Sequence, residues 1–251
     1  MTPIRQPGLF FRTNLLYPLT IALGLPLALG PWAPARAQEA PQEAPKEEAP
    51  APDADDPAKL KEQIAALQKE VNELKLKLVS TDLEKLGASM TVDKAQDGAE
   101  IATVNVLKTW SGDQSGLEIL KTVPNLQVVY IDNEKVDDAA LAPLKELTGL
   151  TALTLMSPAI TDAGLDNIQG LSGLTMLFLT NSKITDAGLE KLKGLANLQV
   201  LSLSQTEVTD AGLEALKELK NLKSVYLIGA QVSTEAVEKF KEAIPGVAVY
   251  Q

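Results

Sequence analysis

Leu174-Thr-Met-Leu-Phe-Leu-Thr-Asn-Ser-Lys-Ile-Thr-Asp-Ala-Gly-Leu189 decides the fold, because near-copies of this stretch stand 24 residues upstream and downstream. The upstream copy runs from Leu150 to Leu165 and the downstream copy from Leu198 to Leu213. Each copy has a Leu-x-x-Leu-x-Leu run and ends in Thr-Asp-Ala-Gly-Leu. A unit that recurs in this way cannot bury its own apolar face, so the copies are expected to stack into a solenoid.

These motifs resemble leucine-rich repeats, specifically the ribonuclease-inhibitor-like or cysteine-containing subtype with its Thr-Asp-x-Gly-Leu segment. The resemblance covers roughly residues 100–251 and implies an α/β fold, a leucine-rich-repeat solenoid with a curved parallel sheet inside and helices outside. Strands are predicted near 102–106, 127–131, 151–155, 175–179, 199–203 and 223–227, with a closing strand from Val247 to Tyr250. Helices are predicted near 114–121, 137–146, 162–169, 186–193, 210–217 and 234–243.

The N-terminus has the pattern of a secretory signal peptide. Arg5 and Arg12 precede an apolar stretch over residues 15–30, and a small-x-small site ends at Ala37. We therefore predict a signal peptide over 1–37 and export to the periplasm, the cell envelope or the extracellular space. An uncleaved membrane anchor is the alternative, although the stretch is shorter than the roughly 20 residues that span a bilayer. After cleavage no stable membrane insertion is expected.

Residues 38–57 consist mainly of Ala, Pro, Glu, Gln and Asp and are predicted to form a disordered linker. A coiled-coil helix is predicted over 58–80, where apolar residues follow a heptad pattern. This seam supports a possible homodimer, and a helix that folds back onto the solenoid is the alternative. The seam residues are Leu60, Ile64, Leu67, Val71, Leu74 and Leu78.

A helix break is predicted at Ser80, followed by a short helix from Asp82 to Leu86. Residues 90–93 and 101–107 then read as a hairpin with a turn at Gln96-Asp97-Gly98. Since a solenoid needs a cap on its first open edge, residues 81–100 are the candidate N-terminal cap and 101–251 the solenoid.

Composition restricts the function. The chain has 33 acidic and 23 basic residues, a net charge of −10, and neither His nor Cys. The acidic balance argues against nucleic-acid binding, which needs a concentrated basic face. Without imidazole or thiolate, the commonest general bases, nucleophiles and zinc ligands are missing. We therefore expect no enzyme, no catalytic residues, no metal site and no cofactor.

The Thr-Asp pairs of the repeats are predicted to be structural. A Thr or Asp side chain at a helix start accepts backbone N–H groups, and Asp also stabilises the positive end of the helix. A column of carboxylates that binds calcium is the alternative, but the pattern lacks the loop that gathers calcium ligands. The predicted helix-capping residues are Thr161, Asp162, Thr185, Asp186, Thr209 and Asp210.

The concave face of the sheet is the candidate binding surface. Residues between the core positions of each strand point to this face, which is normally polar because it meets solvent. Here it carries aromatic, Met and aliphatic side chains, as protein-binding surfaces do. The alternative is a set of scattered apolar residues that a parallel sheet tolerates or that the N-terminal helix covers. The candidate partner-binding residues are Tyr130, Met156, Met176, Phe178, Val200, Tyr226 and Ile228.

The sequence therefore predicts a non-catalytic, exported scaffold that binds an unidentified protein through this concave face. A structural cell-envelope element organised by the coiled coil, with the repeats as a rigid spacer, is the second hypothesis. A glycan hydrolase would need paired carboxylates, and Asp132 is the only acid among the concave positions.

Overall fold

The computed structural model describes residues 56–96, 98–112 and 114–251. The predicted signal peptide, residues 1–37, and residues 38–55 of the predicted linker lie outside this part of the chain. The described residues all fall within one compact unit, Asp53–Gln251. The fold described below is that of this unit.

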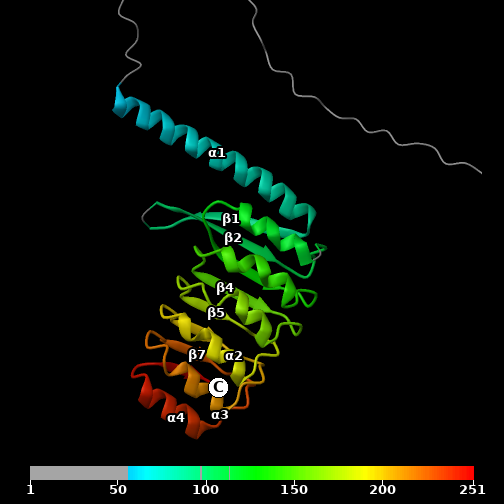
Figure 1. The fold of residues 1–251 in the computed structure, drawn as a ribbon, viewed down its shortest axis with the longest axis vertical. Helices are drawn as coiled ribbons and strands as arrows, with labels where there is room; N and C mark the ends of the chain where they lie inside the picture. The colour runs from blue at the N-terminus through cyan, green and yellow to red at the C-terminus, as the bar shows by residue number, and fades with distance from the viewer. Residues whose placement is uncertain (1–55, 97, 113) are drawn as a thin grey trace, which may run out of the picture. The chain divides into compact units, whose positions relative to one another are not determined.

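Within the described residues, eight strands form one sheet in the order β1 to β8, so each strand pairs with its neighbours in the chain (Figure 1). β1 and β2 pair antiparallel, and every later pair is parallel. The predicted stack of parallel strands is thus confirmed. The strands are β1 (Ala88–Lys94), β2 (Glu100–Val106), β3 (Leu126–Asp132), β4 (Ala152–Met156), β5 (Met176–Phe178), β6 (Val200–Ser202), β7 (Ser224–Tyr226) and β8 (Ala248–Tyr250).

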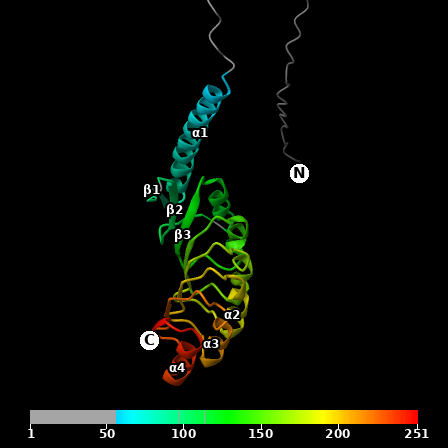
Figure 2. The ribbon, with the colours of Figure 1, turned by 90° about the vertical axis from the view of Figure 1, so that its left-hand side faces the viewer.

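The segments that return from one strand to the next lie together on the other side of the repeats (Figure 2). They are η1 (Gln114–Thr122), η2 (Ala139–Glu146), η3 (Asp162–Asn167), α2 (Asp186–Leu189) with η4 (Glu190–Gly194), α3 (Asp210–Leu216) and α4 (Thr234–Ala243). The four η segments are 3-10 helices, a winding that the sequence did not predict. A 3-10 helix rises about 2.0 Å per residue against 1.5 Å for an α-helix, so it crosses the repeat with fewer residues.

The leucines of each repeat form one continuous core. Leu153, Leu177 and Leu201 are partners in register across β4, β5 and β6, and all three are fully buried. The neighbouring leucines at the start and end of each run are equally buried. Burying one such side chain contributes roughly 1.5–3 kcal/mol, and the stack provides each leucine with partners in two adjacent repeats.

The hairpin predicted from residues 90–107 is present as β1 and β2, with Met90 opposite Val104. Met90 packs against the core, so β1 extends the sheet beyond the first parallel strand while covering apolar side chains. The assignment of 81–100 as a separate cap stays a prediction.

α1 (Pro57–Lys85) has clear signals at both ends. Asp56 is the N-cap, where its Oδ1 accepts the Ala58 N–H at 2.9 Å. At the other end, Gly87 follows with φ +80°, the left-handed conformation that commonly ends helices. The carbonyl of Gly87 accepts the Thr109 hydroxyl at 2.8 Å, which connects the helix end to the solenoid.

The predicted break at Ser80 and the separate helix over Asp82–Leu86 are wrong, because α1 continues without interruption through Ser80 to Lys85, with Leu86 as its C-cap. The two hydroxyl residues at this point remain helical because each hydroxyl has a partner inside the helix. Ser80 Oγ donates to Glu84 Oε1 at 3.4 Å, and Thr81 Oγ1 donates to the Lys77 carbonyl at 3.0 Å.

α1 contacts the solenoid with one side of its C-terminal part. Val79 and Leu83 are buried in the core that continues into the repeats, whereas all six seam residues are exposed. The fold-back alternative therefore does not cover the seam. None of the helices in the described ranges is long and apolar enough to cross a bilayer.

Candidate interaction surface

The parallel register places the candidate partner-binding residues in rows that cross the strands. One row runs through Tyr130, Thr154, Phe178, Ser202, Tyr226 and Tyr250, which are paired from β3 to β8. A second row runs through Val128, Ala152, Met176, Val200, Ser224 and Ala248. These rows alternate with the buried leucines, so they form the sheet face turned away from the core, the concave face.

All seven candidate residues retain contact with solvent. Met176 is 39% exposed. Ile228, which follows Tyr226 by two residues after the end of β7, is 54% exposed. The other five, Tyr130, Met156, Phe178, Val200 and Tyr226, are half-buried by their neighbours. An apolar group that is half-buried before binding is already ordered, so further burial costs little conformational entropy.

The C-terminal end of the concave face is aromatic. The rings of Tyr226 and Tyr250 are stacked, with centroids 4.7 Å apart and an angle of 12° between their planes. Tyr250 is 47% exposed and was not among the candidate residues. Its signal was present in the sequence, because Tyr250 stands 24 residues after Tyr226 in a segment already predicted to be a strand.

The middle of the concave face combines an aromatic ring with hydroxyl groups. Phe178 lies in register between Thr154 and Ser202. The Ser202 hydroxyl is within hydrogen-bond distance of Thr180 Oγ1 (3.2 Å) and Ser204 Oγ (3.4 Å). Ser202 itself is buried, so the half-buried hydroxyls of Thr180 and Ser204 are the groups that this part of the face can offer to a partner beside the ring.

The N-terminal end pairs Tyr130 with Met156. The Tyr130 hydroxyl donates to Met156 Sδ at 3.4 Å, which orders the thioether. Asp132 is in register with Met156 and brings a half-buried carboxylate to this end of the face. Across the described residues, no group of three or more His, Cys, Asp or Glu side chains is placed to hold a metal ion.

The predicted helix-capping threonines lie at helix starts. Thr161, Thr185 and Thr209 are N-cap residues of η3, α2 and α3. Each Oγ1 accepts the backbone N–H two residues later, at 3.2–3.3 Å. The three caps are alike because the repeats are alike.

The aspartates of the motif have different partners from those expected of helix caps. Asp162 Oδ1 accepts the Thr185 N–H at 2.9 Å, and its Oδ2 accepts the Thr185 hydroxyl at 2.6 Å. Asp186 binds Thr209 in the same way, at 2.8 and 2.6 Å. Each carboxylate therefore binds the N-cap threonine of the next repeat rather than the start of its own helix. Both of its oxygens already accept hydrogen bonds.

This Asp–Thr ladder extends beyond the three obvious motifs. Asp138 binds Thr161 at 2.8 and 2.6 Å, and Asp210 binds the amide and hydroxyl of Ser233 at 2.6 and 2.8 Å. The hydrogen bonds from Ser233 lower the pKa of Asp210 below its usual range, with a smaller contribution from Lys239. The two residues added to the ladder, Asp138 and Ser233, stand in segments that differ from Thr-Asp-Ala-Gly-Leu, so the motif alone did not identify them.

The glycine of the motif leaves room for the ladder. A Cβ at Gly188 would lie 2.8 Å from Asp162 Cγ and 3.1 Å from Leu165 Cδ1. The carboxylate of one repeat thus passes directly over the glycine of the next. Small size at this position is required for the contact between repeats.

The helical side carries the ion pairs. Lys121 bridges Glu118 and Glu146 at 2.8 and 2.6 Å. Lys193 bridges two repeats in the same manner through Glu190 and Glu218, at 2.6 and 3.0 Å. Hydrogen bonds to these carboxylates raise the pKa of both lysines. Exposed pairs contribute little to stability, so they chiefly keep this side solvated.

Comparison with known proteins agrees with the repeat architecture. Residues 172–231 match the family model described as "Leucine rich repeat". Residues 172–231 thus carry leucine-rich repeats, and they lie within the stacked parallel sheet of the solenoid. No curated protein matches the sequence.

Two solved structures from Listeria monocytogenes are similar to part of the chain. An internalin (inlF) is 22% identical, with a TM-score of 0.45, over 53% of this chain and 37% of its own length. An internalin C2 (inlC2) is 25% identical, with a TM-score of 0.42, over 59% of this chain and 69% of its own. The chain thus spans little more than a third of the first of these proteins.

Proposed function

We propose that this protein is an exported, non-catalytic scaffold that binds another protein through the concave face. One observation carries the proposal: the register aligns half-exposed aromatic, Met and aliphatic side chains in adjacent rows on a solvated sheet face. Aromatic and Met side chains are enriched in protein interfaces, and large aromatic ones are the commonest hot spots. A Leucine rich repeat match is consistent with a binding role.

The chemistry of the concave face indicates the kind of partner. Phe178, Met176 and Tyr226 offer apolar contact area, while the half-buried hydroxyls of Thr180 and Ser204 offer hydrogen bonds. The ion pairs lie on the opposite side of the repeats. The partner is therefore expected to present an apolar, weakly charged surface, and its binding should depend little on salt.

Two finer assignments belong to the same proposal. The N-terminal pattern of residues 1–37 supports export, and the Asp–Thr ladder with its Thr-Asp-Ala-Gly-Leu motif supports the cysteine-containing repeat subtype. A structural cell-envelope element remains the second candidate. It is favoured by α1, which leaves an exposed apolar seam that the concave face does not explain.

Capture of partners from envelope extracts tests the binding face. The purified protein is compared with a Phe178→Asp, Tyr226→Asp variant, after circular dichroism has shown that both are folded. The matched control is Ala187→Asp, Ala211→Asp, because both alanines are exposed on the helical side and receive the same charges.

The proposal expects one protein that the wild type and the control retain and the concave-face variant loses. Hydrogen exchange of that complex should show protection in β5, β6 and β7. If the concave-face variant retains the same protein as the control, the binding site lies elsewhere and the structural role of α1 becomes the leading hypothesis.

A further inference from the structure

α1 carries two apolar stripes on different sides. The first, Leu76, Val79, Leu83 and Leu86, contacts the solenoid: Val79 and Leu83 are buried and the other two pack against the core. The Leu86 carbonyl also accepts the Ser111 N–H at 2.8 Å. At 100° per residue, the seam lies about 120° around the helix from this stripe. The solenoid therefore holds α1 in a way that leaves the seam free.

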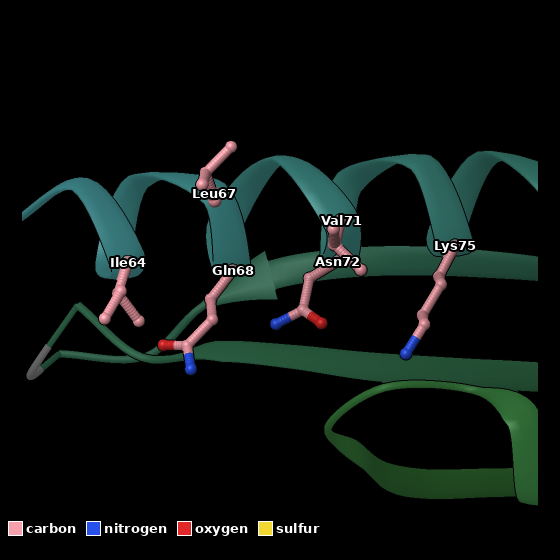
Figure 3. A pocket seen from close by; sticks show the side chains of 6 residues that line it. All are labelled: Ile64, Leu67, Gln68, Val71, Asn72 and Lys75. Atoms are coloured by element: carbon pink, nitrogen blue, oxygen red, sulfur yellow. The ribbon is translucent and has the colours of Figure 1, made fainter. Parts of the chain in front are cut away.

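The seam is an exposed apolar surface with the geometry of a coiled coil. Its six residues, Leu60, Ile64, Leu67, Val71, Leu74 and Leu78, are 46–66% exposed. Figure 3 shows Ile64, Gln68 and Lys75 projecting to the same side of α1, next to a shallow hollow lined by α1 residues. A continuous apolar stripe of this size on one helix face is typical of a contact surface.

The heptad positions limit the possible partner helix. Ile64, Val71 and Leu78 occupy a positions, and the other three seam residues occupy d positions as leucines. Mostly β-branched residues at a with Leu at d favour a parallel pair of helices. Three heptads make a short coiled coil, but the docked stripe at Val79 and Leu83 supplies an ordered end from which the helix continues.

The charged residues beside the seam are complementary to a second copy of the same helix. In a parallel pair, each g residue faces the e residue five positions later in the other chain. Glu70 would then face Lys75, and Lys77 would face Asp82, each twice because of the two-fold symmetry. Asp82 is paired with Lys85 at 2.8 Å in the single chain, an exposed contact that is readily exchanged.

The antiparallel arrangement lacks this complementarity. When two copies are centred on the seam, g positions meet g positions and e positions meet e positions. Glu70 would face its own copy and Lys61 would face Lys75, so like charges would be opposed. The charge pattern therefore favours the parallel orientation.

We propose that α1 pairs with a second copy of this chain as a parallel, in-register, two-stranded coiled coil. This inference is independent of the concave face. Because the solenoids attach to the sides of the helices away from the seam, each protomer keeps its own concave face. A dimer would gain avidity for a partner only where both faces can engage together.

The first test measures the oligomeric state of the full chain by analytical ultracentrifugation. The seam variant is Leu67→Lys, Leu74→Lys, and the control is Ala65→Lys, Ala66→Lys, which adds the same charge to exposed positions outside the seam. Wild type and control should sediment as dimers and the seam variant as a monomer. A monomeric wild type overturns the proposal and leaves the seam to a different partner. A seam variant that remains dimeric also overturns the proposal.

The second test distinguishes the orientation by charge. Glu70→Lys and Lys75→Glu should each weaken the dimer several-fold, because like charges then meet at both symmetric contacts. Mixing the two variants should restore a heterodimer, since both contacts regain opposite charges. In an antiparallel coil, Lys75→Glu would instead face Lys61 and strengthen the dimer, an outcome that refutes the parallel orientation.

The third test uses the absence of cysteine from the chain. Under oxidising conditions Ile64→Cys should link two copies by one disulfide, whereas Ala66→Cys, which points away from the seam, should not. An antiparallel pair centred on the seam would hold the two Cα atoms at position 64 about 15 Å apart, which is too far for a disulfide. A failed link at position 64 in a proven dimer therefore contradicts the in-register parallel coil. Failure of the proposed concave-face binding would not change the outcome of these three tests, because Phe178 and Tyr226 lie outside the seam.

Discussion

The contact between the aspartate of one repeat and the glycine of the next predicts a specific non-additivity. In the wild type, Asp162 accepts two hydrogen bonds from Thr185, and its carboxylate lies over Gly188. Asp162→Ala removes these bonds. Gly188→Ala should break the same bonds by another route, because its Cβ would occupy the space of the carboxylate.

The expected free energies follow from those contacts. Hydrogen bonds to a charged group contribute about 1.5–3 kcal/mol each, and the lower end applies because Asp162 is partly exposed. Asp162→Ala should therefore cost about 2–3 kcal/mol. Gly188→Ala loses a similar amount but regains about 0.5–1 kcal/mol of helix propensity, for a net cost of about 1–2 kcal/mol. In the double variant the bonds are lost only once, so its free energy of unfolding should fall by about 2 kcal/mol.

Urea unfolding followed by circular dichroism measures all four proteins of this double-mutant cycle. The fluorescence of Trp110, which is buried next to the first repeat, gives a second probe and shows whether the repeats unfold together. Gly170→Ala is the control, because a Cβ at Gly170 meets no atom within 4 Å. Its stability should change by less than about 0.5 kcal/mol.

The coupling between Asp162 and Gly188 is disproved if the two costs simply add. A coupling free energy below about 0.5 kcal/mol would mean that Asp162 and Gly188 act independently. In that case the glycine is required by its backbone or by Leu165, whose Cδ1 would lie 3.1 Å from a new Cβ.

The core and the end of the Asp–Thr ladder give two further predictions. Leu177→Ala should lower the free energy of unfolding by about 3–5 kcal/mol, because Leu177 is fully buried between two strands; a loss below about 1 kcal/mol in urea titrations would contradict a rigid core. Because the pKa of Asp210 is lowered in the folded protein, its carboxylate stabilises the fold at pH values above its unfolded pKa. This stabilisation is lost as pH falls through the folded pKa. The loss of Tm from about pH 6 to pH 3 should therefore be smaller in Asp210→Asn, and an unchanged pH profile would show that the Ser233 contact does not stabilise the fold.

Local sequence signals predicted the elements that depend on nearest neighbours. The 24-residue repeat identified the strands and the threonine positions, because every copy meets the same environment. The break at Ser80 was mispredicted from local propensity. There the hydroxyls of Ser80 and Thr81 found partners within the helix, and burial of Leu83 against the solenoid favoured its continuation.

The partners of the Asp–Thr ladder could not be read from one repeat, because each carboxylate binds a residue 23 positions later. The stack of Tyr250 on Tyr226 likewise depends on the register of the last two strands. In both cases the deciding contact joins two repeats.

The sequence alone is enough to predict a solenoid of leucine-rich units, the residues of its core and the heptad seam of α1. Which side of α1 the solenoid covers, and which side remains exposed, depends on the packing of the folded chain. The physical reason is that both apolar stripes satisfy the same helical periodicity. Only contact with the first repeat distinguishes Val79 and Leu83, which are buried, from Leu74 and Leu78, which are not.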